Sequence, residues 1–411
     1  MNASIPRPHP ATDEMPSNSN NEIRIERIKS LDLITFAEKY LGSAKDGQFI
    51  PITMQRAIAH ANNPLVDEND VGLLVAFHGD ECVGFFGIMP VLLKNRDKYS
   101  KVSWFTTWRV SPHLRGKSIG SLLMKEALSL GRDYLIVGSS SARKVCQRFG
   151  FLEREPLEYC YLDVSGMERL NPATWVSRLL RKVLKPLNVK VNVDNRATRG
   201  FSQLLSPLSS KLFRYWLWRS HRDILKGITV QEVDEVQPDT PDQIAGLSPV
   251  ILYRGAEIVN WMLKYPWVVE AGQSKTEKMD YYFTDVRDYY RNIALGLSSG
   301  SNLDYRGYAI LSVSTYRKRM ALRVLDTSFN NPVDERYVLP LAIRYAHEMK
   351  ADVIDLSTPQ AEAIQSRFLR RVLLHRKKRI YQCFPASPDS PLAQAWPEIE
   401  FHYCDGDMAF S

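Results

Sequence analysis

The sequence is poor in the residues that hold metals or form disulfides. Its 411 residues include five cysteines and eight histidines, and none of these falls in the short spacings typical of zinc ligands. An odd number of widely spaced cysteines is typical of a reducing compartment. We therefore expect a cytoplasmic protein with no metal and no disulfide framework.

Long apolar runs are also lacking. We find no stretch of about 18 uncharged apolar residues and predict no membrane-spanning helix. Residues 1–21 are rich in proline, serine and asparagine and have no apolar core of a signal peptide, so we predict a disordered tail. The chain does have length: 411 residues, 44% of them hydrophobic, predict two domains with sizeable cores.

The most informative stretch is a basic turn, Arg115-Gly116-Lys117-Ser118-Ile119-Gly120. A strand is predicted before it over residues 102–110, and a helix after it over residues 119–130. Free N–H groups and the helix dipole at such a turn attract phosphate, and the two cations add full charges. The turn therefore predicts a phosphate site, although a solvated helix cap is the plain alternative.

A second segment follows in a matching order. Residues 134–138 predict a strand, and then comes Ala142-Arg143-Lys144-Val145-Cys146-Gln147-Arg148-Phe149-Gly150-Phe151. Together with Val110-Ser111-Pro112 and Gly120, these residues resemble the GNAT superfamily of acyl-CoA N-acyltransferases over residues 22–164. Two positions depart from the family pattern: Ser118 replaces the first loop glycine, and Cys146 stands where a tyrosine is usual.

The predicted elements of residues 22–164 follow the order of the GNAT fold. Helices are expected over 30–41, 52–60, 119–130 and 142–149, and strands over 72–78, 82–93, 102–110, 134–137 and 157–164. We therefore expect an α/β domain with a mixed twisted sheet flanked by helices.

The second half, residues 227–411, repeats this pattern and predicts a second GNAT-like domain. Strands are expected over 308–316, 320–326, 353–356 and 380–384, and helices over 337–346 and 361–372. In place of a phosphate loop stands Asn330-Asn331-Pro332-Val333-Asp334-Glu335. Because its two carboxylates would repel a pyrophosphate, we expect acyl-CoA in the first domain only.

The net charge of +8 is concentrated in residues 165–226, which hold 13 lysines and arginines against 3 acids. We expect a basic helical connector, beginning with an amphipathic helix at 175–184 and ending in the aromatic and basic run 212–219. A membrane-surface helix, a nucleic-acid face and a clamp for an anionic substrate are the alternatives. We expect no nucleic acid and at most weak peripheral association with anionic membranes.

The resemblance implies the chemistry of the first domain. It predicts an acetyl or short acyl group moving directly from acyl-CoA to a primary amine of a small molecule, such as an amino sugar or polysaccharide precursor. The pantetheine arm would pair with the edge of the 102–110 strand, and N–H groups near Val110 would hold the oxyanion. The residues expected to bind acyl-CoA are Trp108, Val110, Arg115, Gly116, Lys117, Ser118, Ile119 and Gly120.

Proton transfer is less well defined by the sequence. Cys146, Tyr159 and Tyr161 are candidates to protonate the leaving thiolate, and packing is the alternative for each. Candidate bases are Asp80, Glu81 and His113, for which a place in a turn or on the surface is the alternative.

The acceptor could bind between the two halves, where pockets are common. Arg254, Glu257, Asn260 and Trp261 introduce a helix that could face such a cleft, as could Asp405 and Asp407; an exposed tail is the alternative for these two. Two other classes of function stay open: a catalytically silent acyl-CoA sensor, and a peptidyl or aminoacyl transferase of cell-wall type.

Overall fold

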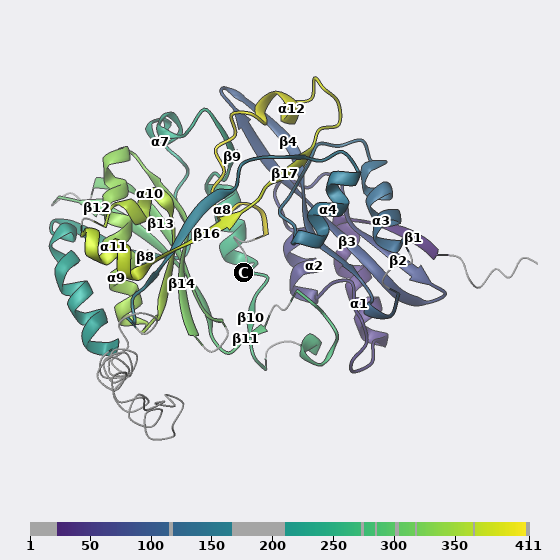
Figure 1. The fold of residues 1–411 in the computed structure, drawn as a ribbon, viewed down its shortest axis with the longest axis horizontal. Coiled ribbons are helices and arrows are strands. Elements are labelled where there is room, and N and C mark those ends of the chain that lie inside the picture. Colours follow the sequence, from purple (N-terminus) through teal and green to yellow (C-terminus); the bar gives the residue numbers. More distant parts are fainter. Residues whose placement is uncertain are drawn as a thin grey trace, which may run out of the picture.

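The computed structural model describes residues 23–114, 118–166, 210–272, 275–283, 286–300, 304–316, 319–364 and 366–407. Two sheets lie side by side, each flanked by helices, and the C-terminal end of the described chain lies between them (Figure 1). The expected tail at 1–21, the turn residues 115–117 and connector residues 167–209 lie outside the described residues.

The first sheet has the strand order β1-β2-β3-β4-β5-β17-β6, and β9 pairs with β3. Its strands are β1 (Ile23–Lys29), β2 (Val71–His78), β3 (Glu81–Asn95), β4 (Lys98–Val110), β5 (Tyr134–Ile136), β6 (Leu152–Glu153), β9 (Val250–Tyr253) and β17 (Gln382–Phe384). Its helices are α1 (Leu33–Ser43), α2 (Met54–Ala61), α3 (Ile119–Leu128) and α4 (Ser140–Arg148).

Both faces of the first sheet are covered. Phe85 and Phe86 are neighbours on β3 yet lie in different cores, because successive side chains of a strand point to opposite faces. Phe85 packs in the core beneath α1 and α2, and Phe86 packs in the core beneath α3 and α4. The elements expected over 22–164 are confirmed, with β1 and β6 added.

The second sheet has the order β16-β7-β15-β14-β13-β12-β8. Its strands are β7 (Leu157–Asp163), β8 (Ile228–Val233), β12 (Tyr290–Ser299), β13 (Asp304–Tyr316), β14 (Arg319–Phe329), β15 (Val353–Ser357) and β16 (Leu374–Arg379). The helices of this half are α7 (Pro241–Gly246), α8 (Ala256–Lys264), α9 (Val338–Glu348), α10 (Thr358–Glu362), α11 (Arg367–Leu373) and α12 (Pro391–Ala395). A separate two-stranded parallel sheet consists of β10 (Val269–Glu270) and β11 (Val286–Arg287). The single helix expected over 361–372 is wrong: α10 and α11 are separate.

The two halves exchange their last strands. β7 lies between β15 and β16 of the second sheet, whereas β17 lies between β5 and β6 of the first. The order β8-β12-β13-β14-β15 in the second sheet corresponds to β1-β2-β3-β4-β5 in the first, and β9 has no counterpart among the described strands. A cut at residue 164 would therefore leave each sheet without an inner strand, and the domain limits 22–164 and 227–411 stay a prediction.

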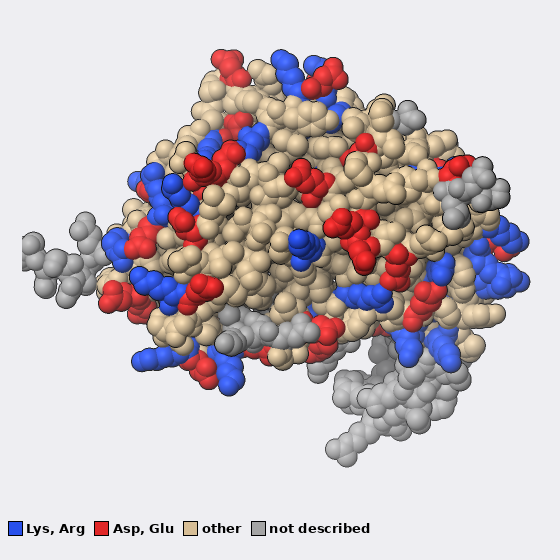
Figure 2. Space-filling model, turned by 180° about the vertical axis from the view of Figure 1, so that it is seen from behind, with Lys and Arg blue, Asp and Glu red and all other residues tan. Residues whose placement is uncertain are grey.

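The end of the connector packs on the second half. Residues 210–221 are helical, with Leu217 buried and with Phe213 and Trp218 against the core of the second sheet. Tyr215 and Trp216 remain 54% and 49% exposed. No helix in the described part of the chain is long and apolar enough to cross a membrane. On the face shown in Figure 2, acidic and basic side chains are interspersed.

Candidate active site

The first sheet opens between β4 and β5. These strands pair in parallel only from Ser103–Phe105 against Tyr134–Ile136. Beyond Phe105, β4 continues along β3 to Val110, and no described strand pairs with its other edge. We name the gap beside β4 residues 106–110 the first opening. It exposes backbone N–H and C=O groups to a ligand.

A bulge in β4 coincides with this opening. The register between β3 and β4 shifts between Phe86 and Ile88, so that Thr106 and Thr107 both face Gly87. A Cβ atom on Gly87 would lie 2.4 Å from Thr106 Oγ1 and 2.6 Å from Thr107 Oγ1. Only glycine fits there, and the bulge bends β4 at the point where its pairing with β5 ends.

The backbone of Val110 faces the opening. The N–H of Ser111, the next residue, donates to the Val83 carbonyl on β3 at 2.9 Å. Because successive N–H groups point to opposite edges of an extended strand, the Val110 N–H points to the unpaired edge. This is the orientation that the oxyanion role requires.

Ser118 caps α3 in an unusual conformation. Its φ of 60° and ψ of 6° lie in the left-handed region, and its side chain makes no capping hydrogen bond. That region favours glycine, which is the residue that the GNAT pattern has here. The position thus keeps a glycine-type backbone, and the ordinary role of a serine cap is absent.

Four of the predicted cofactor residues lie together. A Cβ atom on Gly120 would meet Trp108 Cζ2 at 3.4 Å and Val110 Cγ2 at 3.6 Å, while Ile119 is buried beneath the turn. Trp108 also stacks on Phe86, with 5.1 Å between ring centroids. The end of β4 and the N-terminus of α3 therefore form one surface. Arg115, Gly116 and Lys117 lie outside the described residues.

Residues 39–151 match the family model described as the acetyltransferase (GNAT) family. They form a GNAT acetyltransferase domain. The match ends just before β6 and β7 and therefore before the exchanged strand. No curated protein matches the chain.

Several solved structures resemble the chain at low sequence identity. A GCN5-related N-acetyltransferase from Anabaena variabilis is 10% identical, with 89% of this chain and 73% of that one covered and a TM-score of 0.44. A probable N-acyltransferase from Enterococcus faecalis is 9% identical, with coverages of 89% and 73% and a TM-score of 0.45. Saccharomyces cerevisiae N-myristoyltransferase with bound myristoyl-CoA is 12% identical, with coverages of 92% and 87% and a TM-score of 0.43. All three TM-scores lie below 0.5, so the family assignment rests on residues 39–151.

The second half covers the other face of the GNAT domain. The Arg109 guanidinium lies 3.8 Å from the centre of the Tyr282 ring, and Tyr281 stacks on Phe85 at 5.9 Å. Asp280 ties this segment down, since its N–H donates to the Gln48 carbonyl at 2.9 Å. The sequence analysis missed this aromatic cover, because no local pattern shows which segment a distant loop will contact.

The three candidate proton donors lie in different places. Cys146 is fully buried in the core beneath α3 and α4, and burial raises the pKa of its thiol to about 12. Tyr159 and Tyr161 lie on the exchanged strand β7 and thus in the second sheet. Tyr159 stacks on Tyr403, and Tyr161 on His375. The three do not converge, and the surroundings of Cys146 favour packing. The three candidate bases, Asp80, Glu81 and His113, are exposed.

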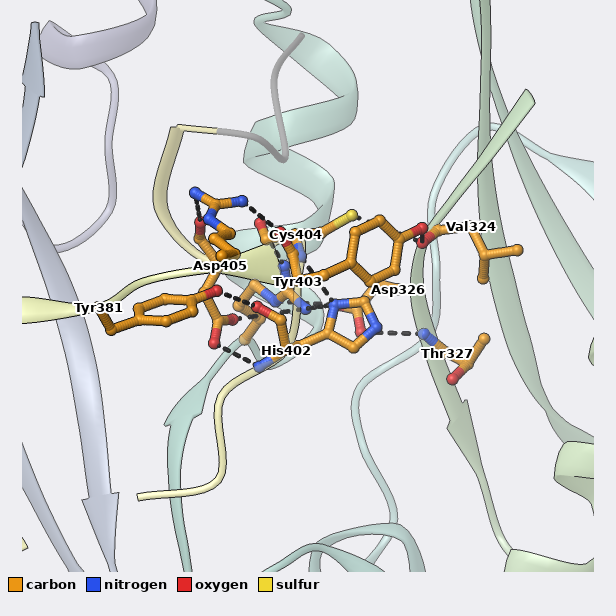
Figure 3. Close-up of polar contacts among 10 residues, drawn as sticks. Val324, Asp326, Thr327, Tyr381, His402, Tyr403, Cys404 and Asp405 are labelled. Atoms are coloured by element: carbon orange, nitrogen blue, oxygen red, sulfur yellow. Dashed lines mark hydrogen bonds and ion pairs between the residues drawn. The ribbon is translucent and has the colours of Figure 1, made fainter. Parts of the chain in front are cut away.

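Asp326, Cys404 and Asp405 belong to a buried cluster between the sheets (Figure 3). These three residues are joined by Arg254. It pairs with Asp326 at 3.3 Å and with Asp405 at 3.8 Å, and it donates to the Cys404 carbonyl at 3.2 Å. Asp405 is 2% exposed and accepts from the His402 N–H at 2.7 Å. Burial raises its pKa to about 6. The exposed-tail interpretation is therefore wrong for Asp405.

The other helix candidates have structural partners. Asn260 bonds both backbone groups of Val236, and Trp261 Nε1 donates to the Ala59 carbonyl at 2.8 Å. Glu257 is exposed on α8, and Asp407 lies 3.6 Å from Arg379. The described residues include no cluster of three metal-ligating side chains, and their five cysteines are free and buried.

The second sheet has an opening of the same kind, which we name the second opening. β14 and β15 pair only from Ala321–Arg323 against Val353–Asp355. Here the Tyr403 hydroxyl enters the gap and lies 2.7 Å from the Val324 carbonyl (Figure 3). It is also 3.0 Å from the Asp355 carbonyl. A side chain of the protein therefore fills the narrow end of this opening.

Proposed function

We propose that the chain is an acyl-CoA-dependent N-acyltransferase that transfers an acetyl or short acyl group to a primary amine of a small molecule. The observation that carries this proposal is the first opening: an unpaired β4 edge that ends beside the N-terminus of α3, within a GNAT acetyltransferase domain. An amino sugar or polysaccharide precursor is the acceptor class that we propose.

The first opening has complementary groups for each part of acyl-CoA. The N–H and C=O groups of β4 residues 106–110 pair with the amides of the pantetheine arm, as an added strand would. The first N–H groups of α3 hold the pyrophosphate, helped by the helix dipole. Arg115 and Lys117 add the charges that the sequence predicts for this turn. Trp108 and Val110 flank the cofactor beside Gly120.

The reaction is a direct attack. The neutral amine nitrogen bonds to the thioester carbon, and the Val110 N–H donates to the oxygen as it becomes negative. The C–S bond then breaks, and the proton lost by the nitrogen passes through water to the departing thiolate. Because a thiolate leaves well without prior protonation, the buried Cys146 is not needed as an acid. Tyr159 or Tyr161 stays a candidate for this proton transfer.

We also propose that the second half is a GNAT-like domain without a cofactor site. Its strand order repeats that of the first sheet, which supports the fold. Asp334 is buried and pairs with Arg306 at 2.9 Å, while Glu335 accepts from Gln360 and Thr327. These acids lie in the turn before α9, where the GNAT domain has its basic turn. They supply negative charge where a pyrophosphate would need cations.

Thiol release tests the proposal. The full chain is mixed with acetyl-CoA and with a panel of small amines that includes glucosamine and spermidine. We expect amine-dependent release of free thiol and a stable amide product, detected by mass spectrometry. Acyl-CoA binding without thiol release for any amine would favour the sensor, and absence of acyl-CoA binding would overturn the proposal.

A further inference from the structure

The wide end of the second opening is a cavity of about 930 Å³. Its wall includes residues 326–328 of β14 and residues 357–359, both of which lie beyond the point where β14 and β15 stop pairing. Tyr403 lies at its inner end, and residues 246–249 together with residues 251–254 in and after β9 form another side. None of the described lining residues belongs to β4 or α3. The cavity is therefore separate from the first opening, and its size suits a small-molecule ligand.

The wall of this cavity carries an excess of negative charge. Its acidic residues are Glu155, Glu158, Asp239, Asp326, Glu400 and Asp405. Its cations are Arg154 and Arg254, and Arg254 is shared between Asp326 and Asp405. From outside the wall, Arg376 and Lys378 pair with Glu158 at 2.8 Å and 3.8 Å, and Arg379 lies beside Asp405. The remaining imbalance favours a cationic ligand.

Asp239 is a partly buried carboxylate of this wall that lacks an ionic partner in the described chain. The Tyr253 hydroxyl donates to its Oδ2 at 2.7 Å, and the Ser328 hydroxyl approaches its Oδ1 at 3.5 Å. Both donors are neutral, and no lysine or arginine of the described chain forms an ion pair with it. Burial, with the nearby charge of Asp239, raises the pKa of Asp326. A bound cation between these two carboxylates would relieve their repulsion.

Tyr308 gives an independent sign of a ligand. Its side chain lies in the cavity wall and is 1% exposed. Its hydroxyl makes no hydrogen bond to any described residue. Burial, with the nearby charges of Asp326 and Asp239, raises the pKa of this hydroxyl. The ring is buried in the wall, whereas the hydroxyl borders the cavity and can bond to a group that enters it. A polar ligand in the cavity would give this hydroxyl its partner.

We propose that the second-opening cavity binds an organic ammonium ion, with the ammonium group between Asp239 and Asp326 and the Tyr308 hydroxyl bonded to the ligand. This inference does not depend on the proposed acyl transfer. An ammonium nitrogen has no lone pair and cannot attack a thioester, so a ligand bound in this form is not in its reacting state. The same chemistry fits the charged form of the acceptor and an unrelated amine.

Titration calorimetry at pH 7 on the full chain tests the site. The probes are glucosamine and ethanolamine, each compared with its uncharged N-acetyl form. We expect at least one amine to bind with a dissociation constant below about 1 mM, and its N-acetyl form at least about tenfold more weakly. Asp239→Asn keeps the acceptor for Tyr253 and should weaken binding about tenfold. Tyr308→Phe should also weaken it yet leave the melting temperature of the free protein unchanged, because the hydroxyl has no partner to lose.

Two controls keep this site distinct from the proposed function. Glu158→Gln lies in the same wall but alters a carboxylate already paired with Arg376, and we expect less than a threefold effect. Gly120→Glu, designed to abolish acyl-CoA binding, should leave amine binding unchanged. An amine that also appears as the acylated product is the acceptor; one that binds unchanged is an effector. The proposal is overturned if no amine binds up to about 10 mM, or if Asp239→Asn binds as tightly as the wild type.

Discussion

The two openings of this molecule share a geometry and differ in chemistry. In each, a parallel strand pair stops after three residues, and the longer strand continues with that edge unpaired. The first opening is bounded by Trp108, Val110 and Gly120 and ends at the N-terminus of α3. The second opening is closed at its narrow end by Tyr403 and is lined by carboxylates at its wide end. A repeated topology therefore specifies where a ligand can bind, and a few side chains decide which ligand fits.

The largest effect is expected at Gly120. Gly120→Glu places a carboxylate beside Trp108 at the expected phosphate site, where a like charge at about 4 Å costs about 4 kcal/mol, or about 1000-fold in acyl-CoA affinity. Gly120→Ala is the matched control, because its Cβ makes only ordinary contacts of 3.4 Å or more. Calorimetry with acetyl-CoA should show loss for the first and a change below about threefold for the second. Equal affinity of the folded glutamate variant would remove the first opening as the site.

The next effect concerns the closed end of the second opening. Tyr403→Ala should lower the free energy of unfolding by about 3–5 kcal/mol, because a fully buried ring and its hydrogen bond are lost. Tyr403→Phe keeps the ring and leaves the carbonyls of Val324 and Asp355 without this donor, at a cost of about 1–3 kcal/mol. Denaturant unfolding measures both. A loss below about 1 kcal/mol for the alanine variant would mean that Tyr403 does not stabilise the closed end of the second opening.

Asp405 should make stability depend on pH. Because its folded pKa of about 6 lies above the ordinary carboxyl value, the folded protein binds a proton more tightly than the unfolded chain does. Its contribution to the free energy of unfolding therefore falls as pH rises from about 4 to about 6, by on the order of 3 kcal/mol. Asp405→Asn should remove this fall.

The measurement compares wild type and variant at several pH values, so that other titrating groups cancel. Glu400→Gln, which alters an exposed carboxylate in the same segment, is the control. A difference between wild type and Asp405→Asn that stays constant from pH 4 to pH 7 would contradict the raised pKa.

The smallest effect is expected at Ser118. Its left-handed backbone costs a serine about 1 kcal/mol, part of which a glycine would recover. Ser118→Gly should therefore leave the unfolding free energy equal or raise it by up to about 1 kcal/mol, while acyl-CoA affinity is retained. Thermal unfolding and calorimetry check the two parts. A clear destabilisation would mean that the hydroxyl has a role that its missing cap bond does not show.

The sequence predicts the local elements well and the long-range arrangement poorly. Periodicity places β4, α3 and α4 within a few residues of their observed bounds, whereas the phosphate site at 115–120 stays a prediction. The exchange of β7 and β17 has no local signal, because a strand's pattern does not specify which sheet it joins. The bulge at Thr106 and Thr107 and the entry of Tyr403 into the second opening likewise depend on contacts between distant segments.

The site residues divide in the same way. Trp108, Val110, Ile119 and Gly120 lie together because they are close in sequence, on one strand and the next helix. Asp239, Tyr308 and Asp326 come from three separate elements of the second half, and no spacing rule connects them. The sequence around Asp405 is typical of a polar tail, but in the fold Asp405 lies in the interior, where it pairs with Arg254.

The number of acyl-CoA molecules bound per chain tests the difference between the two openings most directly. Titration calorimetry with acetyl-CoA should give one site per chain for the wild type and no site for Gly120→Glu. That result would mean that only the first opening holds the cofactor. Two sites per chain, or one site that survives in the folded Gly120→Glu variant, would contradict the account.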